Sequence, residues 1–191
     1  AKFNLGELLA TLGQPEKAID LTRQALATDP LNARWHTFLA NYLSALGQQD
    51  EARQSILKAI ALQPTGTAMH ETLTIIEILR GDAKAAMTAA QQEPPGPWHD
   101  FAVTLALQVG GDAAAADAAV KDMMNRYAAL APYQTAEVHG LRNDADKTFE
   151  WLNRAWVSRD PGIEYLLTDP LILRFRADPR FAAFCKKAGL P

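Results

Sequence analysis

Hydrophobic and polar residues alternate with a helical period over residues 1–64. The stretches 33–46 and 49–62 are amphipathic and of helical length, and they are separated by Gly47 and followed by Pro64. A glycine can adopt the left-handed backbone conformation that ends one helix and lets the chain reverse. Small residues where the two helices approach would let them pack closely, and here they are Ala40, Ala52 and Ala59. The pattern predicts a helical hairpin.

This hairpin recurs along the chain. Equivalent glycines, alanines and prolines stand at one constant spacing, as in Pro30 and Pro64, Gly13, Gly47 and Gly81, and Ala18, Ala52 and Ala86. The spacing is the period of about 34 residues that is typical of the tetratricopeptide repeat (TPR). Residues 1–64 resemble TPR proteins most strongly, with the family's small-residue and proline positions occupied by Asn4-Leu5-Gly6, Gly13, Ala18, Ala25 and Pro30. The resemblance implies an all-α, right-handed superhelix of about five helical hairpins.

The period slips after the second hairpin. Gly81 and Gly111 are closer in sequence than Gly47 and Gly81, and the stretch 93–97 reads Glu-Pro-Pro-Gly-Pro, which breaks a helix. We therefore expect two regular TPR hairpins over residues 1–64. A degenerate third hairpin with a shortened second helix and the proline-rich break would span 65–97, and two degenerate hairpins would span 98–159. Asn143 stands where a glycine ended the earlier first helices, and asparagine also tolerates the left-handed conformation.

Residues 160–191 depart from the repeat and are expected to form helices that cap the solenoid. Asp-Pro pairs begin at Asp160, Asp169 and Asp178, and each is a signal for a helix start. The last repeat of a solenoid exposes an apolar face that needs covering. The residues expected to cover it are Leu166, Leu167, Leu171, Phe175, Phe181 and Phe184. Trp151 and Trp156, at helical spacing, are expected in the core.

The C-terminal third of the chain carries a second resemblance. Lys147-Thr-Phe-Glu-Trp-Leu152 and Arg159-Asp-Pro161, with the segment that follows, resemble the ending of many bacterial signalling proteins. In those proteins a TPR region follows a nucleotide-cyclase, winged-helix or kinase-type domain. The resemblance implies a regulatory context. The chain also begins with Ala1 rather than Met, inside a repeat, so we expect a fragment of a longer protein.

Composition and charge narrow the function. The chain has 191 residues, 48% of them hydrophobic, and a formal net charge of -3, so strong attraction to nucleic acid is not expected. The single cysteine, Cys185, rules out an internal disulfide and is compatible with a cytoplasmic location. No apolar run approaches the ~20 residues of a membrane span, so no membrane insertion is expected.

Candidate chemistry is sparse, and we expect no catalysis, metal or cofactor. His36 and His70 occupy equivalent repeat positions without further ligands, so packing explains them better than zinc. Neither His99-Asp100 nor Glu137-x-His139 is accompanied by a nucleophile or a phosphate loop. Lys186 and Lys187 would lower the pKa of the Cys185 thiol, but nearby phenylalanines favour a packed, structural thiol. The basic C-terminal cluster fits a solvated face, or salt bridges to Asp169 and Asp178; it comprises Arg174, Arg176, Arg180, Lys186 and Lys187.

In TPR proteins the first helix of each hairpin lines a concave groove, so the resemblance implies groove positions here. Carried onto this chain, they are Phe3, Glu7, Arg34, Thr37, Asn41, Glu71, Ile75, Ile78, Trp98, Phe101 and Leu105. Family members that hold a peptide carboxylate use Lys and Asn at set groove positions. This chain has Phe3, Glu7, Phe38, Ala68 and Thr72 there instead. An extended or helical ligand with apolar anchors fits better. The alternative is that Ile75, Ile78 and Trp98 only pack between helices.

These observations favour a non-catalytic protein–protein interaction or regulatory module that binds a peptide or partner protein in its groove, within a larger bacterial signalling protein. Two alternatives stay open. The repeats would regulate an upstream enzyme in cis, such as a nucleotide cyclase or kinase, or they would form a homo-oligomerisation module through the ends of the stack or the alanine-rich fourth hairpin.

Overall fold

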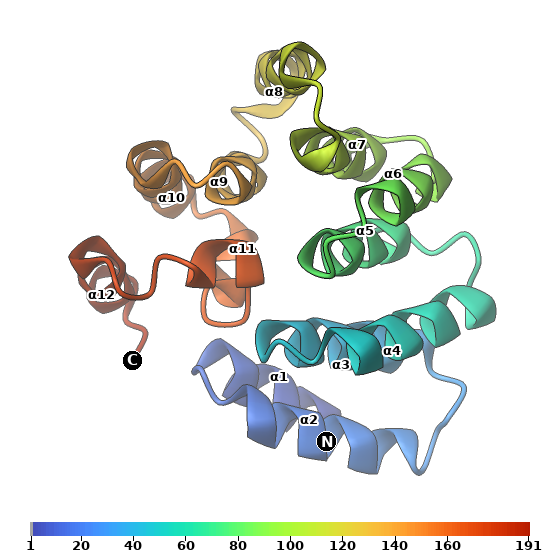
Figure 1. The fold of residues 1–191 in the computed structure, drawn as a ribbon. Coiled ribbons are helices and arrows are strands. Elements are labelled where there is room, and N and C mark those ends of the chain that lie inside the picture. Colours follow the sequence, from blue (N-terminus) through green and yellow to red (C-terminus); the bar gives the residue numbers. More distant parts are fainter. Residues whose placement is uncertain (1) are drawn as a thin grey trace.

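The computed structural model describes residues 2–191, and every regular element in this range is a helix (Figure 1). Five hairpins follow one another, and their first helices are α1 (Lys2–Thr11), α3 (Ala33–Ala45), α5 (Met69–Leu79), α7 (Pro97–Val109) and α9 (Pro132–Leu141). Their second helices are α2 (Pro15–Leu26), α4 (Gln49–Leu62), α6 (Ala83–Gln92), α8 (Ala113–Tyr127) and α10 (Ala145–Ser158). The C-terminal segment contains η1 (Pro161–Tyr165), α11 (Pro170–Leu173) and α12 (Pro179–Ala188).

The hairpins stack in sequence order and form the expected all-α, right-handed superhelix. The first helices contact one another along the stack, α3 against α5, α5 against α7, and α7 against α9. The alanines predicted at the seams are fully buried; these are Ala18, Ala40, Ala52, Ala59 and Ala86. A methyl group at these positions lets helix backbones approach closely, which explains the regular spacing of alanine.

The turns between the helices have the conformations expected from the sequence. Gly13, Gly47 and Gly81 have φ angles of 72°, 76° and 81°, in the left-handed region. Asn143 takes the same role with φ of 59°. Asn32 caps α3 by accepting a hydrogen bond from the Trp35 amide at 3.2 Å. Local signals therefore determine where most of the helices end.

The third hairpin departs from the regular repeat at both of its helices. Helix α5 begins at Met69, because Ala68 before it adopts a left-handed conformation with φ of 65°. Helix α6 has ten residues, against fourteen in α4. It ends at Gln92, immediately before the proline-rich break.

The three Asp-Pro pairs begin the C-terminal helical elements, as predicted. The side chains of Asp160, Asp169 and Asp178 accept hydrogen bonds from backbone amides at the starts of η1, α11 and α12. Five of the six predicted covering residues are buried and Leu167 is partly buried. The expectation for the tryptophans was half wrong: Trp151 is 5% exposed, but Trp156 is 36% exposed. Five residues along a helix correspond to about 140° around its axis, so Trp156 faces away from the core that contains Trp151.

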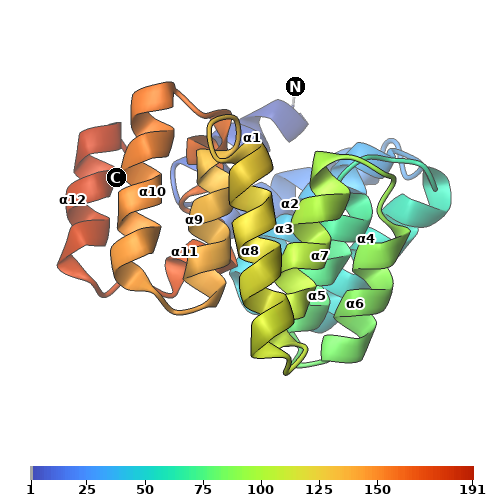
Figure 2. The ribbon, with the colours of Figure 1, turned by 90° about the horizontal axis from the view of Figure 1, so that it is seen from above.

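The C-terminal segment also returns to the beginning of the chain. Element η1 contacts α1, and α11 contacts α3 as well as α9. Leu167 packs at Gly13, where a Cβ atom would lie 3.1 Å from a Leu167 methyl carbon. Figures 1 and 2 show that the superhelix curls so that α11 lies on its inner side, close to α3. The cap therefore does more than cover the last repeat, because it joins the two ends of the stack.

The backbone of α11 approaches α9 at a glycine. A Cβ atom on Gly140 would lie 2.6 Å from the carbonyl oxygen of Leu171. Any larger residue would force the two elements apart, so Gly140 permits the position of α11. Leu171 and Ile172 are fully buried in this contact.

Candidate functional site

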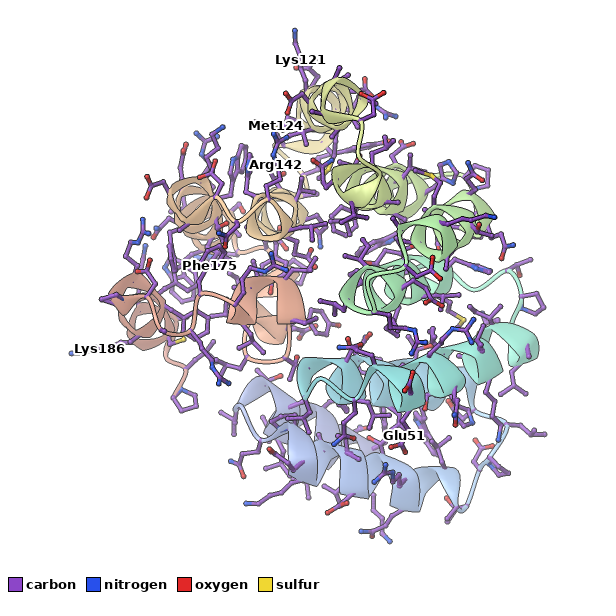
Figure 3. The ribbon with its side chains drawn as sticks, in the orientation of Figure 1. Glu51, Lys121, Met124, Arg142, Phe175 and Lys186 are labelled. Atoms are coloured by element: carbon purple, nitrogen blue, oxygen red, sulfur yellow. The ribbon has the colours of Figure 1, made fainter. Side chains whose placement is uncertain are left out.

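A cavity of about 370 Å³ lies on the concave side of the superhelix. It is lined by residues of α3, α5 and α9, by Thr67 and Ala68 before α5, by Trp98 of α7, and by Tyr165, Thr168, Asp169 and Pro170 of the C-terminal segment. Figure 3 shows side chains projecting from α3, α5 and α11 toward the inner side, whereas the labelled Lys121 and Lys186 lie on the outer surface. The C-terminal segment, which folds back over the repeats, therefore forms part of the cavity wall.

Six of the predicted groove residues line this cavity together. They are Arg34, Thr37, Asn41, Glu71, Ile75 and Trp98. They come from three different first helices, so the stacking of the repeats brings them to one surface.

Two further predicted groove residues lie at the N-terminal side of this surface. Phe3 is buried, and its ring stacks on Trp35 with centroids 5.5 Å apart. Glu7 accepts a hydrogen bond from Arg34 at 2.8 Å, so the two form a partly exposed ion pair. Glu7 also lines a smaller cavity of about 40 Å³ between α1, α3 and η1.

The remaining three predicted groove residues lie within the core. Ile78, Phe101 and Leu105 are buried in the apolar cluster of α5, α7, α8 and α9. The predicted apolar groove residues are therefore divided between two places. Ile75 and Trp98 face the cavity, whereas Ile78, Phe101 and Leu105 pack in the core.

Several cavity residues were not predicted from the sequence. They are Tyr133, Glu137, Tyr165 and Asp169. Phe38, which occupies one of the family's groove positions, lines the cavity as well. The sequence of helix α9, PYQTAEVHGL, does indicate that the helix is surrounded by other elements, because polar and apolar residues lie on all of its sides. A helix of that kind is amphipathic in no single direction, which fits an element surrounded by partners. It contacts α7, α8, α10, α11 and η1.

Glu93, in the proline-rich break, caps helix α5 although the two are far apart in the sequence. Its carboxylate accepts hydrogen bonds from the backbone amides of Ala68 at 2.6 Å, His70 at 3.0 Å and Glu71 at 3.0 Å. The helix N-terminus carries amides without intrahelical partners and a partial positive charge, both of which favour a carboxylate. Ala68 has no side chain able to serve as the cap, so Glu93 takes that role and positions the wall of the cavity.

Three buried carboxyl groups line the cavity, and their pKa values are all raised. Burial raises the pKa of Glu71 to about 8, and the charges of Glu93 and Asp169 add to the shift. Burial and the charge of Asp169 raise the pKa of Glu137 well above its ordinary value. Burial raises the pKa of Asp169 to about 6, against hydrogen bonds that favour its ionised form.

Asp169 is the best-satisfied of the three carboxyls. It accepts hydrogen bonds from the Leu171 amide at 2.8 Å and from the Tyr133 hydroxyl at 3.0 Å. The Glu137 carboxyl is hydrogen-bonded to it as well. Since a carboxyl with a raised pKa keeps its proton, Glu137 is the donor in that pair. Asp169 is therefore the first of the two to ionise.

Two of the other candidate histidines lie within hydrogen-bonding distance of backbone carbonyl groups. His36 Nε2 lies 3.0 Å from the Pro30 carbonyl oxygen, and His99 Nδ1 lies 3.0 Å from that of Glu93. Burial lowers the pKa values of His70 and His139. No group of three or more His, Cys, Asp or Glu side chains in residues 2–191 is arranged to hold a metal ion.

At the C-terminus, burial raises the pKa of the Cys185 thiol, so the adjacent lysines do not activate it. The basic cluster forms only one of the two expected salt bridges. Arg180 pairs with Asp178 at 2.7 Å and also with Asp146. The expected bridge to Asp169 was wrong, because Arg174 donates to the Leu141 carbonyl oxygen instead and Asp169 faces the cavity.

Among the helices of residues 2–191, none combines the length and the apolar character that crossing a bilayer requires.

Comparison with known proteins supports a TPR protein. Residues 9–76 match the sequence model of the tetratricopeptide repeat family. No curated protein sequence matches the chain significantly.

Among solved structures, TTC0263, a thermophilic TPR protein from Thermus thermophilus, aligns with a TM-score of 0.61 at 17% identity and 97% coverage of both chains. YrrB, described as a TPR protein with an unusual peptide-binding site, aligns with a TM-score of 0.51 at 16% identity, over 97% of this chain and 90% of that one. At these identities the two structures show the fold alone, which is that of a TPR solenoid.

Proposed function

We propose that the chain is a non-catalytic module that binds a peptide or a segment of a partner protein on its concave side. The observation that carries this proposal is the 370 Å³ cavity, in which the exposed parts of Phe38, Ile75 and Trp98 form an apolar wall. Its volume lies within the roughly 300–1,000 Å³ that is typical of ligand sites. The polar groups beside the apolar wall would orient the bound segment.

The ligand enters this surface with apolar anchors, because no lysine–asparagine clamp for a terminal carboxylate is present at the family's positions. Within residues 2–191, Arg34 is the one basic residue that lines the cavity, and it is already paired with Glu7. A free peptide carboxylate would face Asp169, which ionises above about pH 6, and would meet no unpaired cation in the described lining. Internal segments of a partner therefore suit the site better than C-terminal tails.

Selection of binding peptides from a random library, followed by affinity measurement on variants, tests this proposal. Ile75→Asp and Trp98→Ala are expected to weaken a selected peptide by about tenfold or more, as expected for apolar anchors. Val157→Asp is the matched control, since Val157 is 78% exposed on α10. Peptides that bind all three variants equally would contradict the proposal. Phe101→Asp is unsuitable, because Phe101 is core and its variant would unfold.

We also propose that this module belongs to a larger bacterial signalling protein in the cytoplasm, where it binds a partner or regulates an upstream enzyme in cis. The support is the resemblance of the C-terminal third of the chain to the endings of such proteins. The gene sequence upstream of Ala1 tests this directly. A cyclase, winged-helix or kinase-type domain there would support the proposal, and an open reading frame without one would contradict it.

Self-association is a second candidate, favoured by one observation. Leu5 and Leu8 of α1, and Leu12 in the turn that follows it, are 49%, 56% and 38% exposed and lie at the N-terminal end of the stack. Sedimentation velocity over a range of concentrations would detect association, and a Leu5→Glu, Leu8→Glu double variant should abolish it. A monomer at all concentrations would rule this candidate out.

A further inference from the structure

The walls of the cavity contain more acidic than basic groups. Glu71, Glu137 and Asp169 line it, and each is more than nine-tenths buried. In the described part of the chain the only basic residue of the lining is Arg34, whose side chain is 65% exposed at the edge and is bound to Glu7. The interior therefore has three carboxyl groups and no cation from residues 2–191 to pair with them.

The Glu71 carboxyl is weakly hydrogen-bonded within residues 2–191. The residue is 7% exposed, and the one hydrogen bond recorded for its carboxyl group in the described part of the chain is a long one from the Thr72 hydroxyl at 3.4 Å. That hydroxyl has one proton, which it donates to the Ala68 carbonyl oxygen at 3.0 Å. A buried carboxyl without a partner costs free energy that is recovered only when a donor arrives. The Glu71 carboxyl can therefore accept further hydrogen bonds from a donor that enters the cavity.

The remaining walls suit the apolar stem of a basic side chain. Phe38, Trp98 and Tyr165 line the same cavity as the carboxyl groups. Lysine and arginine bury their methylene stems along apolar surface, and their charged ends interact favourably with aromatic rings. A guanidinium group presents five donors, enough to engage more than one carboxyl group at once.

We propose that the cavity binds the ammonium or guanidinium group of a lysine or arginine side chain from the partner peptide. This inference rests on the proposed peptide-binding function and names the chemistry that the peptide must carry. Within residues 2–191 the carboxyl groups are not arranged to hold a metal ion, so an organic cation with hydrogen-bond donors is the ligand class that they fit.

Binding of a cation is expected to release protons. The carboxyl groups hold protons because they are buried together, and an incoming cation favours their ionised forms. The affinity for a basic peptide should therefore rise with pH between about 6 and 9. The titratable and charged groups that face this site from all packed elements are Arg34, Glu71, Glu93, Tyr133, Glu137, Asp160, Tyr165 and Asp169.

Peptide titrations monitored by NMR test the proposal. The probes are acetylated and amidated alanine pentapeptides whose central residue is arginine, lysine, citrulline or glutamate. Citrulline has the shape of arginine without its charge. Arginine and lysine peptides should bind at least tenfold more tightly than the citrulline peptide, which itself should exceed glutamate. Equal affinity for arginine and citrulline would overturn the proposal.

Variants identify the groups involved. Glu71→Gln and Glu137→Gln should each weaken the arginine peptide by about ten- to a hundredfold, as expected for loss of a charge-assisted hydrogen bond. Both variants should remain folded, because glutamine has the shape of the protonated carboxyl. Glu51→Gln is the control, since Glu51 (labelled in Figure 3) is exposed on α4 and is not a cavity residue. Unchanged affinity in both cavity variants would overturn the proposal.

Two further measurements distinguish this cation site from a site for a free guanidinium compound and from the proposed peptide-binding function. Butylguanidine carries a guanidinium group and an apolar stem without a peptide, and tighter binding of butylguanidine than of the arginine peptide would overturn the assignment to a peptide side chain. Library peptides that depend on Ile75 and Trp98 but contain no basic residue would overturn the cation site and leave the proposed function standing. If neither the basic pentapeptides nor any library peptide bound, both the cation site and the proposed peptide-binding function would be overturned.

Discussion

Removal of the Glu93 carboxylate is expected to destabilise the protein strongly, although Glu93 lies in a loop. The side chain is 2% exposed and accepts three backbone hydrogen bonds at the start of α5. In Glu93→Ala all three amides lose this acceptor, and the positive end of the helix dipole loses its counter-charge.

The magnitude follows from the geometry. A hydrogen bond to a charged acceptor contributes about 1.5–3 kcal/mol, and a charge at a helix N-terminus about 0.3–1 kcal/mol. Water entering the vacated volume would recover part of the total. We therefore expect Glu93→Ala to lower the free energy of unfolding by about 3–5 kcal/mol, with a fall in Tm of roughly 2–4 °C per kcal/mol for a chain of this size. Glu93→Gln keeps one acceptor oxygen, so a loss of about 2 kcal/mol is expected.

Urea unfolding followed by circular dichroism at 222 nm measures these differences. Glu16→Ala is a matched control, because Glu16 is an exposed acidic residue in the first turn of α2. Its effect should stay below about 1 kcal/mol. If Glu93→Ala changed the free energy of unfolding by no more than this control at an unchanged m-value, the Glu93 carboxylate would not stabilise the start of α5.

Two other predictions concern the contact between α9 and the C-terminal segment, and the buried carboxyl groups. Gly140→Ala should cost about 1–3 kcal/mol in urea unfolding, because its methyl group meets the Leu171 carbonyl oxygen. Gly110→Ala, where a Cβ has only ordinary contacts, is the control, and equal effects would refute the close approach. The pKa of Glu71 is raised to about 8 in the folded protein, so the unfolded chain ionises first as pH rises from about 4.5. The free energy of unfolding should fall across pH 4.5–8, by up to about 1.4 kcal/mol per pH unit for one proton, and then level off. Glu71→Gln should flatten this decline, and an unchanged slope in that variant would show that Glu71 does not retain its proton on folding.

The repeats were predictable because their signals are local. A glycine that needs a positive φ angle, an alanine at a close helix contact and an aspartate before proline each act within one or two helical turns. They indicated the hairpins, most helix ends and the three C-terminal starts. Ala68 is an exception, since alanine gives no sign of a left-handed conformation, and the nearby cap comes from Glu93.

The site was predictable only in part, because it depends on contacts between distant segments. The groove positions of the TPR family correctly indicated six cavity residues, which come from α3, α5 and α7. Nothing in the spacing of residues indicated that the segment around Asp169 would return to α3, or that Glu137 would line the same cavity as Glu71. These contacts depend on the curvature of the whole stack, which no local pattern encodes.

The C-terminal segment closes the superhelix and supplies part of the cavity wall, including Asp169. Leu167 and Gly13 are in direct contact in the closed form. The most direct test is a nuclear Overhauser effect in the free protein between the Gly13 α-protons and a δ-methyl group of Leu167. A strong cross-peak is expected. Assigned resonances without this cross-peak would contradict the closure, and with it the acid-lined cavity.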